Sequence, residues 1–209
     1  MDDADTRQAA ATSLAPEDQA RANWYGLISR LFYGPPDGNL LAEISRAGPE
    51  DDAPDGAGEL IAAWRGLQDA CRTAYPALVR QEYDTLFVGV GKSEVSPYLS
   101  GYAESPAPDR YLVRLRDRLA ACGLARRAGA FEVEDHISGI SDIMRRLIED
   151  RRPLAEQRSF FEEFARSGAI QFCAALQNAP SARFYKPVST LTSIFLAIEA
   201  AAFEMSDES

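Results

Sequence analysis

Histidine is almost absent from this 209-residue sequence, which contains only His136. A zinc site needs three or four nitrogen, sulfur or oxygen ligands at characteristic spacing. His136 has neither a second histidine nor a cysteine near it in the sequence. Carboxylates are plentiful, but no stretch resembles the calcium-binding loop of an EF-hand. We therefore expect no metal ion and no other cofactor.

Cysteine is also scarce. Cys71, Cys122 and Cys173 lie roughly fifty residues apart, and no two of them form a Cys-x-x-Cys pair. An odd, dispersed set argues against a disulfide framework and is typical of a reducing compartment. Each cysteine falls on an apolar helical face, where a free thiol behaves as a small hydrophobic side chain. We predict that all three are buried.

Positive charge is in deficit, since the net charge is -10 and the pI is about 4.7. Such a chain repels phosphate backbones and anionic lipid, which argues against nucleic-acid and membrane partners and favours a basic peptide. No run of about 18 apolar residues is present, so no stable membrane insertion is expected. The acidic start, residues 1–5, leads into no apolar segment and is not a secretory signal. We expect a cytoplasmic protein.

β-branched residues are few, with only seven valines, whereas alanine and leucine dominate the apolar residues. Alanine and leucine favour helices, and no stretch alternates as a strand would. Apolar residues recur at helical spacing in a series of segments. The spacing predicts an all-α fold with helices over residues 17–33, 40–46, 58–75, 77–88, 109–122, 135–150, 154–177 and 188–203.

Glycine and proline concentrate between residues 89 and 109, which contain Gly89, Gly91, Pro97, Gly101 and Pro106. This composition predicts a hinge or linker. The remaining chain divides into a polar tail over residues 1–15, an N-terminal helical half over 16–88 and a C-terminal helical half over 110–209. We expect a helical bundle whose two halves form one compact domain.

One segment ends like a phosphate-binding loop, Gly89-Val90-Gly91-Lys92-Ser93. The full motif needs an earlier glycine, but Leu86 stands at that position, and a helix rather than a buried strand is predicted before it. Asp135 and His136 could form an acid–base pair, yet no serine, cysteine or threonine is identifiable as their nucleophile. Capping of a helix at the surface is the alternative for this pair. We expect no catalytic residues and no enzyme activity.

Three segments form an ordered pattern: Tyr83-Asp84-Thr85-Leu86-Phe87-Val88-Gly89, Pro97-Tyr98-Leu99-Ser100-Gly101-Tyr102, and Glu132-Val133-Glu134-Asp135-His136-Ile137. In this order and spacing they resemble the TorD/DmsD/NarJ-like family of redox-enzyme maturation chaperones. The stretch Tyr25–Phe32 followed by Pro35-Pro36-Asp37 is similar to the first helix of that family. The resemblance extends over roughly residues 17–200.

The resemblance implies a chaperone that binds the twin-arginine leader, and often the body, of an apo molybdopterin oxidoreductase catalytic subunit. Binding would delay export until the cofactor is inserted. The implied peptide-binding residues are Tyr83, Leu86, Phe87, Pro97, Tyr98, Ser100, Tyr102, Asp135 and His136. Core packing is the alternative for Leu86 and Phe87, and capping of its own helix is the alternative for Asp135. A nucleotide-binding hydrolase around Lys92 and Ser93, and a helical assembly adaptor retained in its complex, are the alternative functions.

Overall fold

The computed structural model describes residues 14–48, 58–89, 93–102, 108–123 and 134–206. Several predicted features lie partly outside this range: residues 1–13 of the predicted tail (1–15), residues 90–92 of the loop-like segment, residues 103–107 of the predicted hinge, and Glu132 and Val133 of the third motif. The helices are α2 (Pro16–Tyr33), α3 (Gly38–Arg46), α4 (Gly58–Thr73), α5 (Pro76–Tyr83), α6 (Pro108–Ala121), α7 (Ile137–Glu149), α8 (Leu154–Phe160), α9 (Arg166–Asn178) and α10 (Tyr185–Met205). The predicted all-α class is confirmed.

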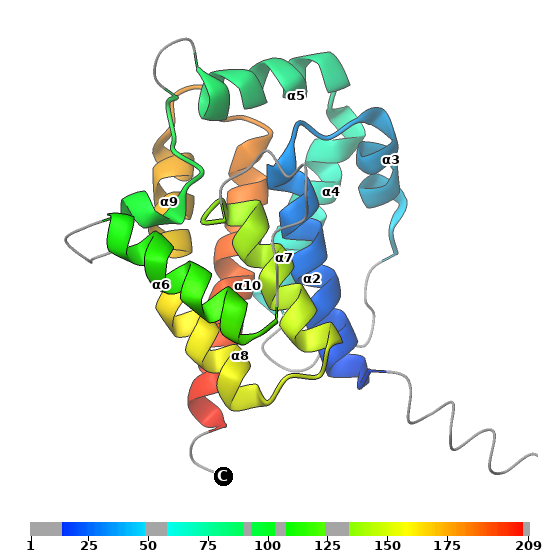
Figure 1. The fold of residues 1–209 in the computed structure, drawn as a ribbon. Helices are drawn as coiled ribbons and strands as arrows, with labels where there is room; N and C mark the ends of the chain where they lie inside the picture. The colour runs from blue at the N-terminus through cyan, green and yellow to red at the C-terminus, as the bar shows by residue number, and fades with distance from the viewer. Residues whose placement is uncertain (1–13, 49–57, 90–92, 103–107, 124–133, 207–209) are drawn as a thin grey trace, which may run out of the picture.

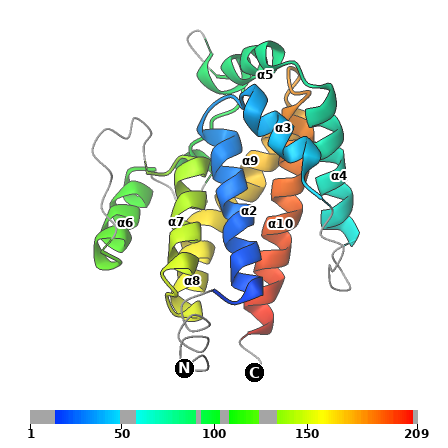
Figure 2. The same ribbon diagram turned by 90° about the vertical axis from the view of Figure 1, so that its right-hand side faces the viewer.

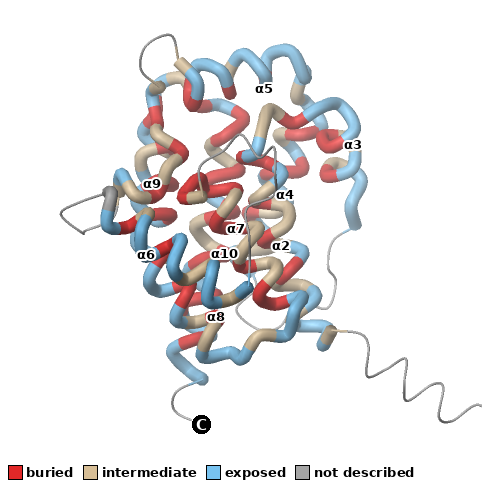
Figure 3. The backbone as a smooth tube through the Cα atoms, viewed as in Figure 1, coloured by how far each residue is buried: buried red, intermediate tan, exposed pale blue. Residues whose placement is uncertain are grey.

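Helices α2, α7, α9 and α10 form the centre of the molecule (Figures 1 and 2). Helix α2 packs along α7, and α10 packs against α9 on one side and α4 on another. Helix α3 covers α4, and α5 crosses one end of the bundle. Helix α6 lies to one side of the other helices (Figure 2). The inward faces of the central helices are buried, while α5 and α6 are largely exposed (Figure 3).

Two predicted helices are interrupted by π-helical turns. The helix predicted over residues 77–88 is α5 followed by the turn η1 (Asp84–Val88), and the helix predicted over 154–177 divides into α8, the turn η3 (Phe161–Ala165) and α9. A π-helical turn bonds each N–H to the carbonyl five residues earlier, so it shifts the buried stripe. Both turns thereby direct aromatic side chains, Phe87 and Phe164 among them, into the core.

The two predicted halves share one hydrophobic core. Helix α2 of the first half packs along α7 of the second half, and α4 of the first half packs against α10 of the second. A single buried apolar cluster contains residues of both halves. The segment predicted as a hinge contributes Val95 and Leu99, which are 4% and 0% exposed. These contacts join the two halves, and the predicted domain organisation, with its division at residues 89–109, stays a prediction.

Helix α10 is long and apolar enough to cross a membrane by length and composition, but half of that stretch is buried inside the protein. Its Glu199, 2% exposed, binds the Arg21 guanidinium through two bonds of 2.8 and 3.0 Å and accepts from Tyr25 Oη at 3.1 Å. A buried carboxylate with these partners is typical of a core helix. Burial, together with the nearby Glu199 carboxylate, raises the pKa of Tyr25.

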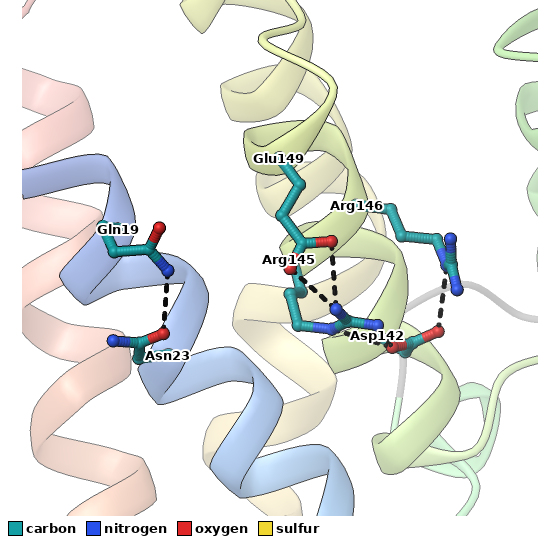
Figure 4. A network of polar contacts seen from close by, with 6 residues as sticks. All are labelled: Gln19, Asn23, Asp142, Arg145, Arg146 and Glu149. Atoms are coloured by element: carbon teal, nitrogen blue, oxygen red, sulfur yellow. Dashed lines mark hydrogen bonds and ion pairs between the residues drawn. The ribbon is translucent and has the colours of Figure 1, made fainter. Parts of the chain in front are cut away.

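Ion pairs cover the outer face of α7, as Figure 4 shows. Arg145 binds Asp142 and Glu149, and Arg146 binds the second oxygen of Asp142. Arg145 and Arg146 are both half-buried on this face. Each pair is worth only about 0.2–1 kcal/mol at such exposure.

The predicted burial of cysteine is confirmed for Cys71 and Cys173. Desolvation raises the pKa of the Cys71 thiol to about 11 and that of Cys173 to about 12. Cys122 is only half-buried, so the prediction is wrong there. It follows the last turn of α6, where its thiol donates to Glu156 at 3.1 Å instead of entering the core.

Candidate functional site

Two of the three motif segments are joined by an isolated antiparallel bridge between Tyr98 and His136. Leu99 N donates to the Asp135 carbonyl at 2.9 Å, and Ile137 N donates to the Pro97 carbonyl at 2.9 Å. The rings of Tyr98 and His136 meet edge to face, with centroids 5.4 Å apart. Segments separated by more than thirty residues are thus fixed against one another by backbone bonds.

His136 caps the start of α7. Its Nδ1 accepts a hydrogen bond from Ser138 N at 3.2 Å and lies 2.7 Å from Ser138 Oγ. The capping alternative is therefore correct for His136, but the ring is 2% exposed and does not lie at the surface. The helix predicted from residue 135 begins at Ile137 because His136 is its cap. The suggested capping by Asp135 is wrong for the same reason.

Asp135 is also 2% exposed, and its backbone oxygen accepts the hydrogen bond from Leu99 N in the bridge. Within the described ranges, no residue donates a hydrogen bond to its carboxylate. Tyr111 of α6 lies close enough for the negative Asp135 to raise its pKa, although burial is the larger cause. Burial of a carboxylate is costly, so this acidic residue of the third motif segment is the clearest candidate for a binding group.

The second segment continues into a 3-10 turn, η2 (Leu99–Tyr102), packed on α9. Tyr102 Oη donates to the Ser96 carbonyl at 2.9 Å, and its ring lies 6.2 Å from that of Phe172. The close fit to α9 depends on Gly168, because a Cβ there would lie 3.0 Å from both Cβ and the carbonyl oxygen of Leu99. Gly168 is therefore a point of close packing between η2 and α9.

The first segment faces the core. Tyr83 Oη donates to the carbonyl of Phe32 at 3.2 Å, and the Phe87 ring lies 5.1 Å from Tyr83 and 5.0 Å from Tyr185. Leu86 is fully buried, and its carbonyl accepts from Val95 N at 2.9 Å. Core packing, the alternative interpretation, therefore describes Leu86 and Phe87 in this structure.

The structure brings all three segments to one region but buries most of the predicted site residues. The half-buried ones are Tyr98, Ser100 and Tyr102, and the buried ones are Tyr83, Leu86, Phe87, Pro97, Asp135 and His136. Only the first group is accessible without a conformational change. Peptide binding by any of the nine stays a prediction.

An open groove on the outer face of the first segment was missed by sequence reasoning. Its volume is about 780 Å³, and it is lined by Ala77, Arg80, Gln81, Asp84, Thr85, Val88, Gly89, Glu94 and Ser181. The signal in the sequence is the helical spacing of Asp84 and Val88, opposite the inward-facing Leu86 and Phe87. A second groove of about 570 Å³, mostly apolar, lies between α4 and α10.

The motif segments supply aromatic rings and a carboxylate, groups that are suited to binding. No group of three histidine, cysteine or acidic side chains that could hold a metal ion occurs within the described parts of the chain. The residues before the loop-like segment are helical, in α5 and η1, so the buried strand that a phosphate loop requires is not there. Aromatic edges beside a buried carboxylate fit a ligand with apolar and basic parts.

A comparison with protein families gives one finding. The family model described as nitrate reductase delta subunit matches residues 53–174, more than half of the chain and all three motif segments. None of the curated proteins searched matches the sequence.

Proposed function

Because this chain belongs to the nitrate reductase delta subunit family, the NarJ/TorD-type chaperones that mature molybdoenzymes, we propose that it binds the twin-arginine leader of an apo molybdopterin oxidoreductase subunit. Binding would take place in the cytoplasm and delay export until the cofactor is inserted. The protein would act by holding its client, without catalytic turnover.

The observation that carries this proposal is the bridge between Tyr98 and His136. It brings a half-buried aromatic side chain to the edge of a segment that contains a buried carboxylate, Asp135. A leader has a basic n-region followed by an apolar stretch. Tyr98 and Tyr102 would contact the apolar stretch, and Asp135 would receive an arginine. Tyrosine is enriched at binding hot spots because it combines apolar area with a polar tip.

The charge of the whole molecule supports a basic ligand. A net charge of -10 attracts a cationic peptide over distances of about a Debye length and raises its association rate. The outer groove near Asp84 and Glu94 adds two carboxylates beside the exposed Val88.

Calorimetric titration with a synthetic leader tests the proposal. A peptide with two consecutive arginines followed by about twelve leucine and alanine residues reproduces the basic and apolar parts. Tyr98→Ala is expected to weaken its binding by about 2 kcal/mol, the loss typical of an aromatic hot spot. Asp135→Ala is expected to cost about 1–3 kcal/mol, because an arginine of the leader would lose a charged partner.

Tyr75→Ala and Asp69→Ala are matched controls, since both residues are exposed and lie outside the motif segments. They are expected to leave the Kd unchanged. Equal Kd values for the wild type and both motif variants, with helical content intact, would contradict this assignment of the binding residues.

A further inference from the structure

Helix α6 lies at the edge of the molecule beside the motif segments. It lies apart from the central bundle in Figure 2, and over residues 110–121, the part of α6 whose side chains are described, only Tyr111 and Leu115 are buried. Among the described elements, α6 packs most extensively against η2. Helices with so few buried contacts open at lower free energy than core helices.

The composition of α6 is opposite to that of the whole chain. It contains four arginines and two aspartates, whereas the protein carries a net charge of -10. Tyr111, Leu115 and Leu119 form an apolar stripe along the same helix. Helix α6 is therefore a basic and apolar segment, the same combination that a twin-arginine leader presents.

The basic side of α6 lies on acidic residues of the bundle. Arg114 and Arg118 both pair with Glu163, at 3.6 and 3.5 Å, and Arg116 pairs with Glu134 at 3.3 Å. The side chains of Arg114 and Arg116 remain more than half exposed, so water can replace these pairs at little cost.

The apolar side of α6 is held mainly by Tyr111. Its hydroxyl donates to the Phe164 carbonyl at 2.6 Å, and its ring meets the ring of Phe164 edge to face at 5.5 Å. Phe164 belongs to the π-helical turn η3. The ion pair of Arg116 with Glu134, the residue before Asp135, places α6 beside the segment that carries the carboxylate to which the proposed function assigns a leader arginine.

We propose that α6 is an internal competitor of the leader, which occupies the leader's acidic and aromatic surface and is displaced when the leader binds. This inference rests on the proposed function. Arginines of the leader would replace those of α6 on Glu134 and Glu163, and its apolar stretch would replace Tyr111 and Leu115.

Hydrogen exchange of the wild-type protein tests the displacement directly. The probe is the synthetic Arg-Arg peptide described above, and the measured quantity is deuterium uptake in residues 108–121. We expect uptake to rise several-fold when the peptide is bound, because α6 leaves the bundle. A ligand that binds elsewhere, or on top of α6, leaves the uptake unchanged or lowers it.

A pair of variants tests the competition. Arg114→Gln combined with Arg118→Gln removes the pairs to Glu163 without altering the surface below α6, and is expected to lower the apparent Kd about tenfold. The matched control combines Arg145→Gln with Arg166→Gln, whose carboxylate partners all lie outside α6. Both variants remove two positive charges, so a general gain in attraction for a cationic peptide would appear equally in both.

The outcomes separate the two proposals. Peptide binding with unchanged or reduced uptake in residues 108–121, or an equal gain in affinity for both variants, overturns the competitor role and leaves the leader-binding function intact. Failure of both the wild type and the arginine variant to bind overturns the function and the inference together. Binding by the arginine variant alone supports the inference, because it shows that α6 blocks the site.

Discussion

Glu82 joins the first half of the chain to the last helix, and its removal gives a sharp test of the fold. From the end of α5, its carboxylate accepts hydrogen bonds from three successive backbone N–H groups, those of Arg183, Phe184 and Tyr185, at 2.8, 3.0 and 2.9 Å. These groups start α10 and have no partner within their own helix. A side chain about a hundred residues earlier in the sequence therefore caps the longest helix of the bundle.

The size of the effect follows from the number of bonds and their exposure. A hydrogen bond to a charged group contributes about 1.5–3 kcal/mol, but Glu82 is half-buried and water can reach part of the site. Loss of an ordinary helix cap costs about 0.5–2 kcal/mol. We expect Glu82→Ala to lower the free energy of unfolding by about 2–3 kcal/mol. Glu82→Gln keeps one acceptor oxygen and is expected to cost about half as much.

Urea unfolding followed by circular dichroism measures these changes. The matched control is Glu94→Ala, because Glu94 is exposed and accepts one bond of 3.3 Å, from Ser181 N in the same region. It is expected to cost less than about 0.5 kcal/mol. Unchanged m-values would confirm that the native state alone is altered. A loss for Glu82→Ala as small as that for Glu94→Ala would refute the capping argument.

Gly168→Ala is expected to destabilise the protein by about 1 kcal/mol, because contact of the new Cβ with the Leu99 backbone outweighs the gain in helix propensity. Gly66→Ala, with no atom within 4 Å of its new Cβ, is expected to stabilise by about 0.5–1 kcal/mol, and thermal unfolding of both variants decides the sign. Alkylation of the native protein at neutral pH is expected at Cys122 long before Cys173, whose pKa of about 12 leaves almost no thiolate. Equal labelling of both by mass spectrometry would refute the buried position of Cys173.

Most helices could be predicted from the sequence because their apolar residues recur with the helical period. Helix α7 illustrates this, since Ile140, Met144 and Leu147 are all buried on one face. The π-helical turns could not be predicted in this way. Each π-helical turn adds one residue to a helical turn. In the sequence, Leu86 and Phe87 fit the apolar stripe of a continuous α-helix almost as well as they fit a π-helical turn. In addition, carbonyl groups in these turns bond to distant segments, as the Phe164 carbonyl accepts a hydrogen bond from Tyr111.

The candidate site was predictable only in part. The order of the three motifs indicated that Tyr98, Asp135 and His136 belong together, and the bridge between the segments confirms that they meet. The burial of Asp135 and His136 was not predictable, because the bridge that fixes their segment against residues 97–99 is a tertiary contact rather than a feature of the local sequence. Spacing alone favoured a surface cap at His136 because a charged neighbourhood usually marks a solvated helix start.

The burial of the motif residues changes how mutations in them must be interpreted. Leu86→Ala would remove a fully buried side chain at a cost of about 2–5 kcal/mol, a large share of the 5–15 kcal/mol that stabilises a typical domain. Such a variant would lose its client through unfolding, whether or not Leu86 ever touches a peptide. Tyr98 is half-buried, so its truncation separates the two causes. Loss of binding by Tyr98→Ala at unchanged stability is therefore stronger evidence for a peptide contact than any effect at Leu86 or Phe87.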